Sequence, residues 1–502
     1  MDKICCYPDF EKFKKLTKRG NLIPVYHEML ADMETPVLAF KKIDDGKFSY
    51  LLESVEGQDK IGRFSFLASR PTLVIRSHDS NVEVLKRRGD KFYCLRKMRQ
   101  IDPLKVVKEE MHRYKFVNLS GVPVFCGGMV GFVSYDAVRH FENIPDKNND
   151  DLGVPECVFV LTETLVVFDH LAHKIKIIAN AYVDGPDNLL RSYQLAQKNI
   201  NQIKRLLTCP VIEQKRTTRH RSKKPKIKIV SNMPKSQFIK IVERAKKYIR
   251  DGDIIQVVLS QRFKINFSKD PFDIYRSLRS INPSPYMFFL RFDKFQLIGS
   301  SPEVLVRCEG ETVEVRPIAG TRRRGYDELE DEKLEKELLN DPKERAEHIM
   351  LVDLGRNDIG RVCLKGSVHV SRLMVIEKYS HVMHIVSNVL GRRDKRYDRF
   401  DVLRAAFPAG TVTGAPKIRA MEIIDELEGI KRGPYAGCVG YFSFSGNFDS
   451  CITIRTILAK DNVAYIQAGA GIVADSIPGL EFKETQNKAR ALIKAIEMTE
   501  AV

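Results

Sequence analysis

Hydrophobic positions in the first 205 residues occur in short runs separated by turn residues. Runs of four to eight residues that are rich in β-branched and aromatic side chains are typical of strands. Such runs lie at residues 37–40, 48–52, 72–76, 161–168 and 174–178. Apolar residues at helical spacing then follow at Leu190, Tyr193, Ile200 and Ile203. We therefore predict a mainly antiparallel sheet with helices at its edges for residues 1–205.

The second half begins with an amphipathic helix after Pro234, whose apolar residues from Phe238 to Ile249 recur every three or four positions. Strand-like runs follow in close order at 254–259, 286–292, 296–298, 303–307, 312–316, 438–443, 450–459 and 463–467, with helical segments around 328–355 and 416–428. Short connections favour antiparallel pairing, and grouped strands favour an α+β fold over a doubly wound parallel one. We expect large antiparallel sheets packed as a sandwich with helices outside.

One basic segment separates these halves. Residues 215–228 hold eight lysines and arginines with no acid and no aromatic residue. Such a run indicates a solvated linker first and a contact with a polyanion second. We therefore divide the chain into an N-terminal region (1–205), a basic linker (206–228) and a catalytic domain (229–502).

Composition limits the class of protein. The 502 residues include 83 Lys and Arg against 65 Asp and Glu, which gives a net charge of +18 and raises nucleic acid as a partner. The linker accounts for much of that excess, so nucleic acid is the remote alternative. No apolar run reaches the length of a membrane span, and the ten cysteines are scattered without a C-x-x-C pair. These features predict a cytoplasmic protein with reduced thiols.

Two acidic segments follow prolines that suit helix starts. Pro342 precedes Glu344 and Glu347, and Pro478 precedes Glu481 and Glu484. Glutamates three residues apart share one helix face, so two such faces would offer four carboxylates, a set suited to Mg²⁺. Each pair taken alone also fits an ordinary helix start, where acids complement the helix dipole.

Two glycine-rich stretches resemble nucleotide motifs imperfectly. The stretch from Gly410 to Lys417 has one residue too few for a P-loop, and 469–474 matches G-x-G-x-x-A but is followed by Pro478 where a helix should run. Both can still hold an anion, because a helix N-terminus and close glycine backbone offer N–H groups. With Arg455 and Lys488 nearby in these segments, a dicarboxylate substrate would suit the chain.

At this point a series of ordered segments resembles a known family, the chorismate-utilising enzymes, and in particular anthranilate synthase component I. The segments are 51–54, 282–287, 300–303, 316–325, 341–358, 382–384, 408–417, 433–437, 454–455 and 468–488. They cover nearly the whole chain outside the linker.

The resemblance implies a Mg²⁺-dependent lyase that acts on chorismate. It implies that Glu347 and Glu484 hold the metal, with Glu344 and Glu481 acting through water. It further implies a substrate site formed by Gly320, Thr321, Thr411, Tyr435, Arg455, Gly469, Ala470, Gly471 and Lys488. Glu303 resembles the general acid for loss of the C4 hydroxyl, and His384 resembles the histidine associated with pyruvate elimination, although its apolar neighbours also fit a core histidine.

Two positions bear on the reaction. Ala319 stands where aminodeoxychorismate synthases usually carry a nucleophilic lysine, and Gln256 stands where isochorismate synthases have a lysine base. Without either lysine, attack by ammonia at C2 remains, which would give anthranilate and pyruvate for tryptophan biosynthesis. Aminodeoxychorismate synthase and isochorismate synthase stay as alternatives.

Regulation and partners also follow from the resemblance. Ser54, Pro285, Tyr286 and Met287 resemble a feedback site for L-tryptophan, although both segments also fit strand ends. The chain carries no recognisable glutaminase sequence, so the resemblance implies a separate glutamine amidotransferase subunit, component II, and a hetero-oligomer.

Overall fold

The computed structural model describes residues 5–55, 62–99, 102–210, 227–379 and 382–501. Its two large sheets are built from antiparallel pairs. The strand order of the first sheet is β1 (Leu22–Leu30), β10 (Lys174–Tyr182), β9 (Thr164–Asp169), β3 (Phe64–Ser69), β2 (Phe48–Glu53), β13 (Tyr286–Phe292), β14 (Phe295–Ser301), β23 (Thr456–Lys460), β24 (Val463–Ile472), β12 (Gln256–Asn266) and β11 (Ile229–Ser231), with β20 (Gly414–Ala415) beside β12. The α+β class is therefore confirmed.

The second sheet has the order β17 (Ile318–Arg323), β19 (Val382–Arg392), β16 (Thr312–Val315), β15 (Val304–Glu309), β22 (Phe448–Ile452), β21 (Cys438–Ser443), β7 (Gly128–Val133), β8 (Cys157–Thr162), β4 (Leu73–His78), β5 (Asn81–Arg88) and β6 (Lys91–Arg99), with β18 (His369–Lys378) beside β19. The two sheets face each other across an apolar layer that includes Phe66 and Phe288 from the first sheet and Val130 and Phe132 from the second. Burial of these aromatic and branched side chains drives the packing of the sandwich.

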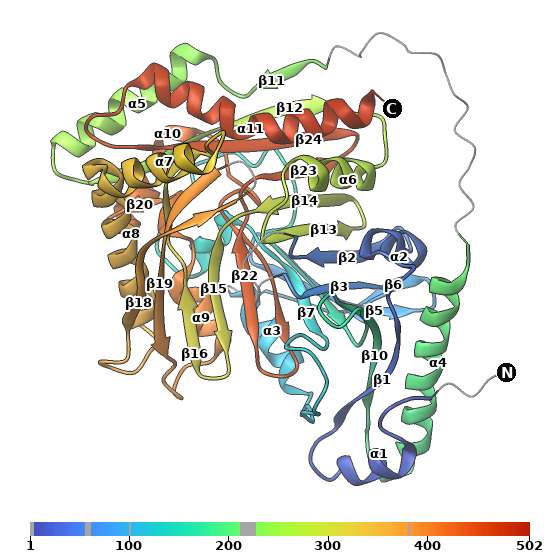
Figure 1. Cartoon of the computed structure of the whole chain (residues 1–502). Helices are drawn as coiled ribbons and strands as arrows, with labels where there is room; N and C mark the ends of the chain where they lie inside the picture. Colours follow the sequence, from blue (N-terminus) through green and yellow to red (C-terminus); the bar gives the residue numbers. More distant parts are fainter. Residues whose placement is uncertain (1–4, 56–61, 100–101, 211–226, 380–381, 502) are drawn as a thin grey trace.

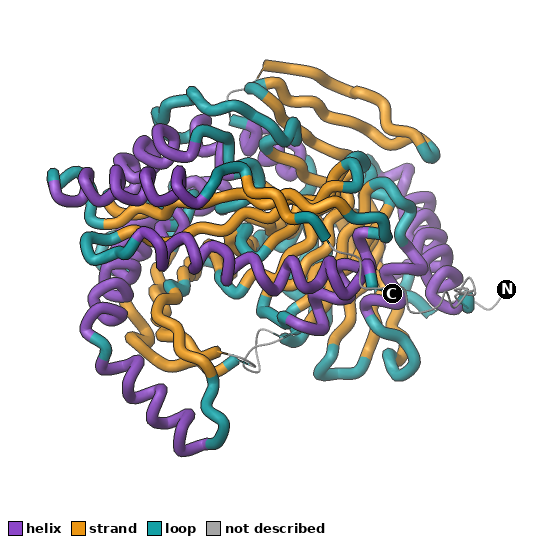
Figure 2. Tube along the Cα trace, turned by 90° about the horizontal axis from the view of Figure 1, so that it is seen from above, coloured by secondary structure: helices purple, strands orange, loops and turns teal. Residues whose placement is uncertain are grey.

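Helices cover the outside of the sandwich (Figure 1). One group packs on the outer face of the first sheet: α1 (Phe10–Leu16), α2 (Pro36–Ile43), α4 (Leu189–Thr208), α6 (Pro271–Ile281) and α11 (Pro478–Glu500). A second group packs around the second sheet and the β12 end of the first: α3 (Pro103–His112), α5 (Lys235–Arg250), α8 (Pro342–Gly360), α9 (Arg399–Ala406) and α10 (Lys417–Glu428). The helix α7 (Glu328–Asn340) precedes α8, and the view in Figure 2 shows α11 running along the sheet it covers.

Both sheets contain strands from each side of the linker. In the first sheet β2 pairs with β13, and in the second β7 pairs with β21. The basic linker falls largely on residues 211–226, outside the described part of the chain. The division into an N-terminal region (1–205), a basic linker (206–228) and a catalytic domain (229–502) therefore stays a prediction.

Several local predictions are wrong at the level of single elements. Residues 37–40 form part of helix α2, because Thr35 caps the helix, accepting a hydrogen bond from the Leu38 amide at 3.2 Å, and Pro36 suits its first turn. The run 161–168 is two strands separated at Glu163, and 450–459 is also two strands. The helices expected around 328–355 are α7 and α8, and α8 begins at Pro342 as predicted, with the Asp341 side chain as its cap. The strand expected at 254–259 begins later and runs on to Asn266.

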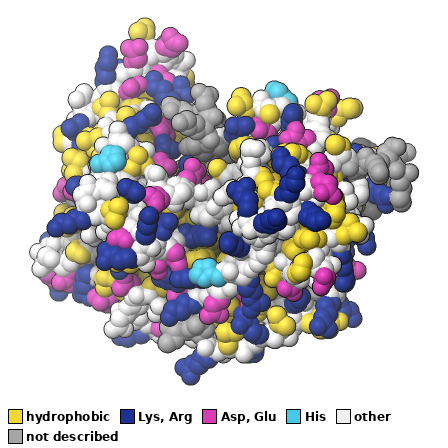
Figure 3. All heavy atoms as spheres, turned by 90° about the horizontal axis from the view of Figure 1, so that it is seen from below, with side chains coloured by type: hydrophobic (Ala, Val, Ile, Leu, Met, Phe, Trp, Pro, Cys, Tyr) yellow, Lys and Arg dark blue, Asp and Glu magenta, His cyan; other side chains and the backbone are white. Residues whose placement is uncertain are grey.

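No helix in the described residues is both long and apolar enough to cross a membrane. On the face shown in Figure 3, basic and acidic side chains are interspersed. Many of the described arginines are paired with acids, as Arg63 is with Asp169 and Arg307 with Asp449. The described surface thus adds no observation in favour of a nucleic-acid partner.

Candidate functional site

A cavity of about 610 Å³ lies where the two sheets and the N-terminal ends of α8 and α11 meet. Its walls come from β12, β17, β19 and β24, from α8 and α11, and from the connections before β15, α10 and β23. It contains nearly all of the residues predicted for the metal and the substrate. They are Glu303, Gly320, Thr321, Glu344, Glu347, His384, Thr411, Tyr435, Arg455, Gly469, Gly471, Glu481, Glu484 and Lys488.

The four predicted metal-binding glutamates lie on one wall of this cavity. Pro342 and Pro478 occupy the first turns of their helices, so the glutamates of both first turns are delivered to the same space. Burial and the charge of Glu347 raise the pKa of Glu344. Burial, together with the charge of Glu484, likewise raises the pKa of Glu481. A wall of partly buried, mutually repelling carboxylates is chemically suited to a bound cation.

These carboxylates already have neighbours that orient them. Gln256 Nε2 donates a hydrogen bond to Glu347 Oε1 at 3.1 Å, and Lys488 Nζ pairs with Glu484 Oε1 at 2.6 Å. Among the described residues, no three His, Cys, Asp or Glu side chains form a complete metal cage. Mg²⁺ commonly takes one or two carboxylates and completes its shell with water and substrate oxygens, so this donor set fits Mg²⁺ rather than a fully protein-coordinated ion.

Glu303 lies apart from the four glutamates and belongs to a different chemical environment. It connects β14 to β15, and only 7% of it is exposed. Burial raises its pKa to about 8, against the opposing charges of Lys488 and Arg455. The Thr411 hydroxyl lines the same cavity beside Glu303 and favours the ionised form of that carboxyl, against the effect of burial. Glu303 is therefore protonated at neutral pH and can donate a proton.

The imidazole of His384 is fixed in one orientation by β17. Its Nδ1 lies 3.0 Å from the carbonyl oxygen of Gly320 and 3.0 Å from the hydroxyl of Thr321. A carbonyl only accepts hydrogen bonds, which assigns the proton to Nδ1 and leaves Nε2 with a lone pair. Burial lowers the pKa of this histidine, so the ring is neutral at pH 7. The pairing of β17 with β19 thus prepares a neutral base at the cavity wall.

Glycines make room for the ligand where a side chain would not fit. A methyl group on Gly469 would lie 2.7 Å from the Tyr435 hydroxyl, and one on Gly471 would lie 2.6 Å from Gln256 Nε2. Ala470 does not line the cavity: the alternation of β24 turns its side chain into the apolar core, where it is fully buried. The prediction that Ala470 belongs to the substrate site is therefore not supported by its side chain.

Cationic groups line the same cavity as the four glutamates. Arg455 occupies the break between β22 and β23 with a φ of +50°, which turns its side chain toward the cavity. Lys488 Nζ donates to the Gly469 carbonyl at 3.0 Å. Sequence reasoning missed Arg432, whose buried guanidinium stands over the Tyr435 ring at 5.5 Å and pairs with Glu428 at 2.7 Å. The feature of the sequence that could have identified Arg432 is its position just before the Gly433–Gly437 motif.

The geometry of loop 410–417 argues against a P-loop that binds nucleotide phosphates. Lys417 Nζ is held by Asp358 at 2.8 Å on both carboxylate oxygens, a largely buried pair that removes the lysine from any phosphate. Thr411 remains directed to the cavity. The loop therefore contributes a hydroxyl and backbone to the site but no lysine.

A separate cavity of about 130 Å³ lies between the sheets near β2 and β13. All four residues predicted for tryptophan line it: Ser54, Pro285, Tyr286 and Met287. The Tyr286 hydroxyl donates to Asp449 at 2.9 Å and accepts from Arg307 at 2.9 Å, while the Ser54 hydroxyl is buried without a partner among the described residues. A cavity lined by apolar side chains together with Glu53, Arg307 and Asp449, and with an unsatisfied hydroxyl, is a suitable site for a small amphipathic ligand.

Comparison with known proteins places this geometry in a family. The chorismate binding enzyme family matches residues 48–494. Anthranilate synthase component 1 of Acetivibrio thermocellus is 51% identical over 98% of each chain. The crystal structure of anthranilate synthase component I from Streptococcus pneumoniae superimposes with a TM-score of 0.75 at 39% identity, covering 92% of this chain and 98% of that one.

A more distant structure shares the fold alone. The menaquinone-specific isochorismate synthase MenF of Escherichia coli has a TM-score of 0.69 at 18% identity, covering 97% of this chain and 98% of its own. The anthranilate synthase components match nearly the whole chain as well, but at much higher sequence identity. The chain therefore belongs to the chorismate binding enzyme family and, within it, to the anthranilate synthase component 1 proteins.

Proposed function

We propose that the chain is the large subunit of an anthranilate synthase and converts chorismate and ammonia to anthranilate, pyruvate and water in tryptophan biosynthesis. The observation that carries this assignment is the cavity wall: Ala319 and Gln256 line it at the two positions where related enzymes of other specificity carry a lysine. A lysine is needed there to attack the ring or to activate water, so externally supplied ammonia is the nucleophile that remains. The reaction breaks carbon–oxygen bonds by elimination, which makes the enzyme a lyase.

The acidic wall supports a requirement for Mg²⁺. Glu347 and Glu484 would hold the ion, with Glu344 and Glu481 acting through bound water. When bound, Mg²⁺ neutralises a substrate carboxylate that the acidic wall would otherwise repel. Arg455 and Lys488 bind the other anionic part of the substrate, and Gly469 and Gly471 let it approach the backbone of β24.

Glu303 and His384 supply the proton transfers. Hydroxide is a poor leaving group, so loss of the C4 hydroxyl as water needs a proton from an acid that is still protonated at neutral pH, which is the state of Glu303. Ammonia forms the new carbon–nitrogen bond at C2. The neutral ring of His384 faces the same space and assists the elimination of pyruvate that leaves the aromatic product.

Product analysis tests the assignment directly. The purified chain with chorismate, Mg²⁺ and concentrated ammonium is expected to form anthranilate, detected by its fluorescence, and an equal amount of pyruvate. The chain contains no tryptophan, so its own emission interferes little. Accumulation of aminodeoxychorismate or isochorismate without anthranilate would assign the chain to one of the two alternative reactions.

We further propose a glutamine amidotransferase as the partner subunit. The relatives are named as component 1, and the chain itself offers no glutaminase nucleophile, so a second component must release ammonia from glutamine. The isolated chain should therefore use ammonium and ignore glutamine until that component is added. The ten cysteines are free thiols, which supports the proposed location in the reducing cytoplasm.

The cavity around Ser54 supports feedback inhibition by L-tryptophan. Its position on β2 and β13, within the sheet that also carries Gly469 and Gly471, allows a rearrangement at one site to reach the other. Any such coupling must act on both affinities, so bound tryptophan and bound chorismate weaken each other by the same factor. Anthranilate formation that continues unchanged at saturating tryptophan would exclude this regulation.

Substitution of Ser54 by alanine tests the tryptophan site. Removal of the buried hydroxyl deletes one hydrogen bond to the ligand, so the tryptophan concentration for half-inhibition should rise about tenfold with little change in uninhibited activity. Ser69→Ala is the matched control, because its hydroxyl is also buried and unpartnered but does not line this cavity. An equal loss of inhibition in both variants would show a general effect on the sheet and not a contact with the ligand.

A further inference from the structure

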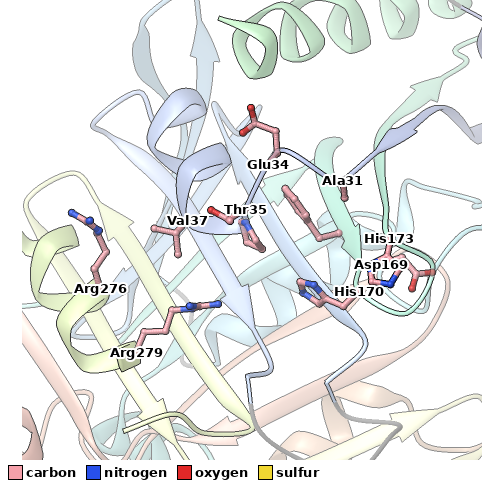
Figure 4. Close-up of a pocket in the computed structure, with 11 residues that line it drawn as sticks. Ala31, Glu34, Thr35, Val37, Asp169, His170, His173, Arg276 and Arg279 are labelled. Atoms are coloured by element: carbon pink, nitrogen blue, oxygen red, sulfur yellow. The ribbon is translucent and has the colours of Figure 1, made fainter. Parts of the chain in front are cut away.

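A third cavity lies on the outer side of the first sheet, remote from the residues assigned to the reaction. Its volume is about 630 Å³, similar to that of the substrate cavity. It is enclosed by the loop between β1 and α2, by the turn between β9 and β10, and by helix α6 (Figure 4). Nothing in the proposed reaction uses it, although a cavity of this size accommodates a small molecule.

The two arginines that face this cavity give it a cationic character. His170, His173, Arg276 and Arg279 line it, and Figure 4 shows Arg279 and His170 reaching toward one another from α6 and from the β9–β10 turn. Each of the two acidic lining residues has a cationic partner, although Glu34 Oε2 accepts no hydrogen bond within the described part of the chain. Glu34 is paired with Lys42 at 2.5 Å, and Asp169 is paired with Arg63 at 2.8 Å. Arg276, whose side chain is half exposed, pairs with Asp273 three residues earlier on the same helix at 2.7 Å, and ion pairs at such exposed positions contribute little stability.

The remainder of the wall is apolar. Pro36, Val37 and Phe168 line the cavity, and the ring of Phe168 stacks near that of His170 with centroids 6.4 Å apart and planes inclined by 24°. Arginines beside an apolar wall suit a ligand that presents an oxyanion to the guanidinium groups and an apolar body to the wall.

We propose that this cavity is a binding site for a small compound that carries a carboxylate or phosphate on an apolar body, with Arg276 and Arg279 as its anion-binding groups. Arg279 also connects this cavity to the one predicted for tryptophan. Its Nε and Nη2 donate to Glu53 at 3.0 and 3.3 Å, and the buried Glu53 lines the second cavity beside Ser54. A ligand on Arg279 therefore competes with Glu53 for the same guanidinium. Any effect of the bound anion on tryptophan binding rests on the proposed feedback site. The binding of the anion in this cavity does not depend on that proposal.

Binding of defined probes to the full chain tests the proposal. Benzoate and phenyl phosphate are titrated by calorimetry at constant ionic strength without tryptophan, with benzyl alcohol as the uncharged analogue. We expect saturable binding of at least one anion and none of benzyl alcohol. The preferred anion then identifies the carboxylate or the phosphate as the natural headgroup.

Arg276→Gln locates the binding, because anions can also enter the substrate cavity through Arg455. Loss of one charge-assisted hydrogen bond should weaken anion binding here at least about tenfold while chorismate turnover persists. Arg356→Gln is the matched control: Arg356 is similarly exposed on a helix and pairs with Asp353 three residues earlier at 2.9 Å. Arg279 is left intact because it neutralises a buried glutamate. Unchanged affinity in Arg276→Gln, or equal binding of benzyl alcohol, would overturn the proposal, whatever the outcome of the anthranilate assay.

Discussion

Replacement of Glu303 by glutamine is expected to lower kcat by about 10²–10⁴-fold, the usual contribution of a positioned general acid. Glutamine keeps the size of the side chain but has no acidic proton to give to the departing C4 hydroxyl. Ammonium-dependent anthranilate formation measures the loss. The KM for chorismate should change little, because Glu303 acts on the leaving group and the anionic parts of the substrate are bound elsewhere.

The same substitution is expected to stabilise the protein at neutral pH. The pKa of Glu303 is about 8 in the folded chain and near 4.5 when unfolded, so the unfolded state ionises first as the pH rises. The free energy of unfolding of the wild type therefore falls, relative to that of the glutamine variant, as the pH rises from about 4.5 to about 8. At pH 7 the difference should be of order 1–3 kcal/mol. Chemical denaturation at pH 4 and pH 7 should show the two proteins converging at the lower pH.

Opposite changes in activity and stability distinguish a catalytic acid from a structural one. Glu311→Gln serves as the control, because Glu311 lies in the turn between β15 and β16, where it pairs with the exposed Arg392 at 3.0 Å. The Glu311→Gln variant should keep nearly the wild-type kcat and the wild-type free energy of unfolding. If Glu303→Gln kept most of its activity, the role proposed for Glu303 would be wrong.

Glu347→Gln and Glu484→Gln are expected to abolish measurable turnover at millimolar Mg²⁺ and to weaken Mg²⁺ binding by at least about 100-fold. Each removes one carboxylate from the proposed Mg²⁺ site in the cavity wall. A readout independent of turnover is the rise in Tm that Mg²⁺ gives by binding only the folded chain, which should disappear in both variants.

Glu497→Gln provides the comparison for the metal site. Glu497 is exposed near the C-terminal end of α11, the helix that carries Glu484, so the variant removes the same charge from the same helix far from the cavity. It should retain both turnover and the response to Mg²⁺. A normal Mg²⁺-dependent Tm shift in Glu347→Gln and Glu484→Gln would place the ion elsewhere.

The sequence predicted the fold class where patterns were long and regular. The helix after Pro234 and the strand at 286–292 form as expected, because spacing alone distinguishes the periods of 3.6 and 2. Short apolar runs did not distinguish a strand from a helix. The run 37–40 has only four residues, and it is helical because Thr35 caps the helix and Pro36 occupies its first turn. The antiparallel pairing of β17 with β19 was not predicted, although it brings Thr321 and His384 together.

Individual site residues were predictable, but their mutual geometry was not. Glu303, His384 and Glu484 lie far apart along the chain, and only the pairing of strands brings them to one cavity. The resemblance to known enzymes supplied that grouping, and it placed Ala470 in the site although β24 turns its side chain away. The raised pKa of Glu303 comes from burial, which no local pattern in the sequence expresses.

The strand pairs β2–β13 and β7–β21 make the two halves of the chain mutually dependent. A fragment that ended at the linker would leave a row of unpaired backbone N–H and C=O groups along one edge in each sheet, together with half of the apolar layer between the sheets. Such edges are templates for aggregation. The two halves are therefore expected to unfold in a single cooperative transition, and truncation of either half should yield insoluble material instead of an active fragment.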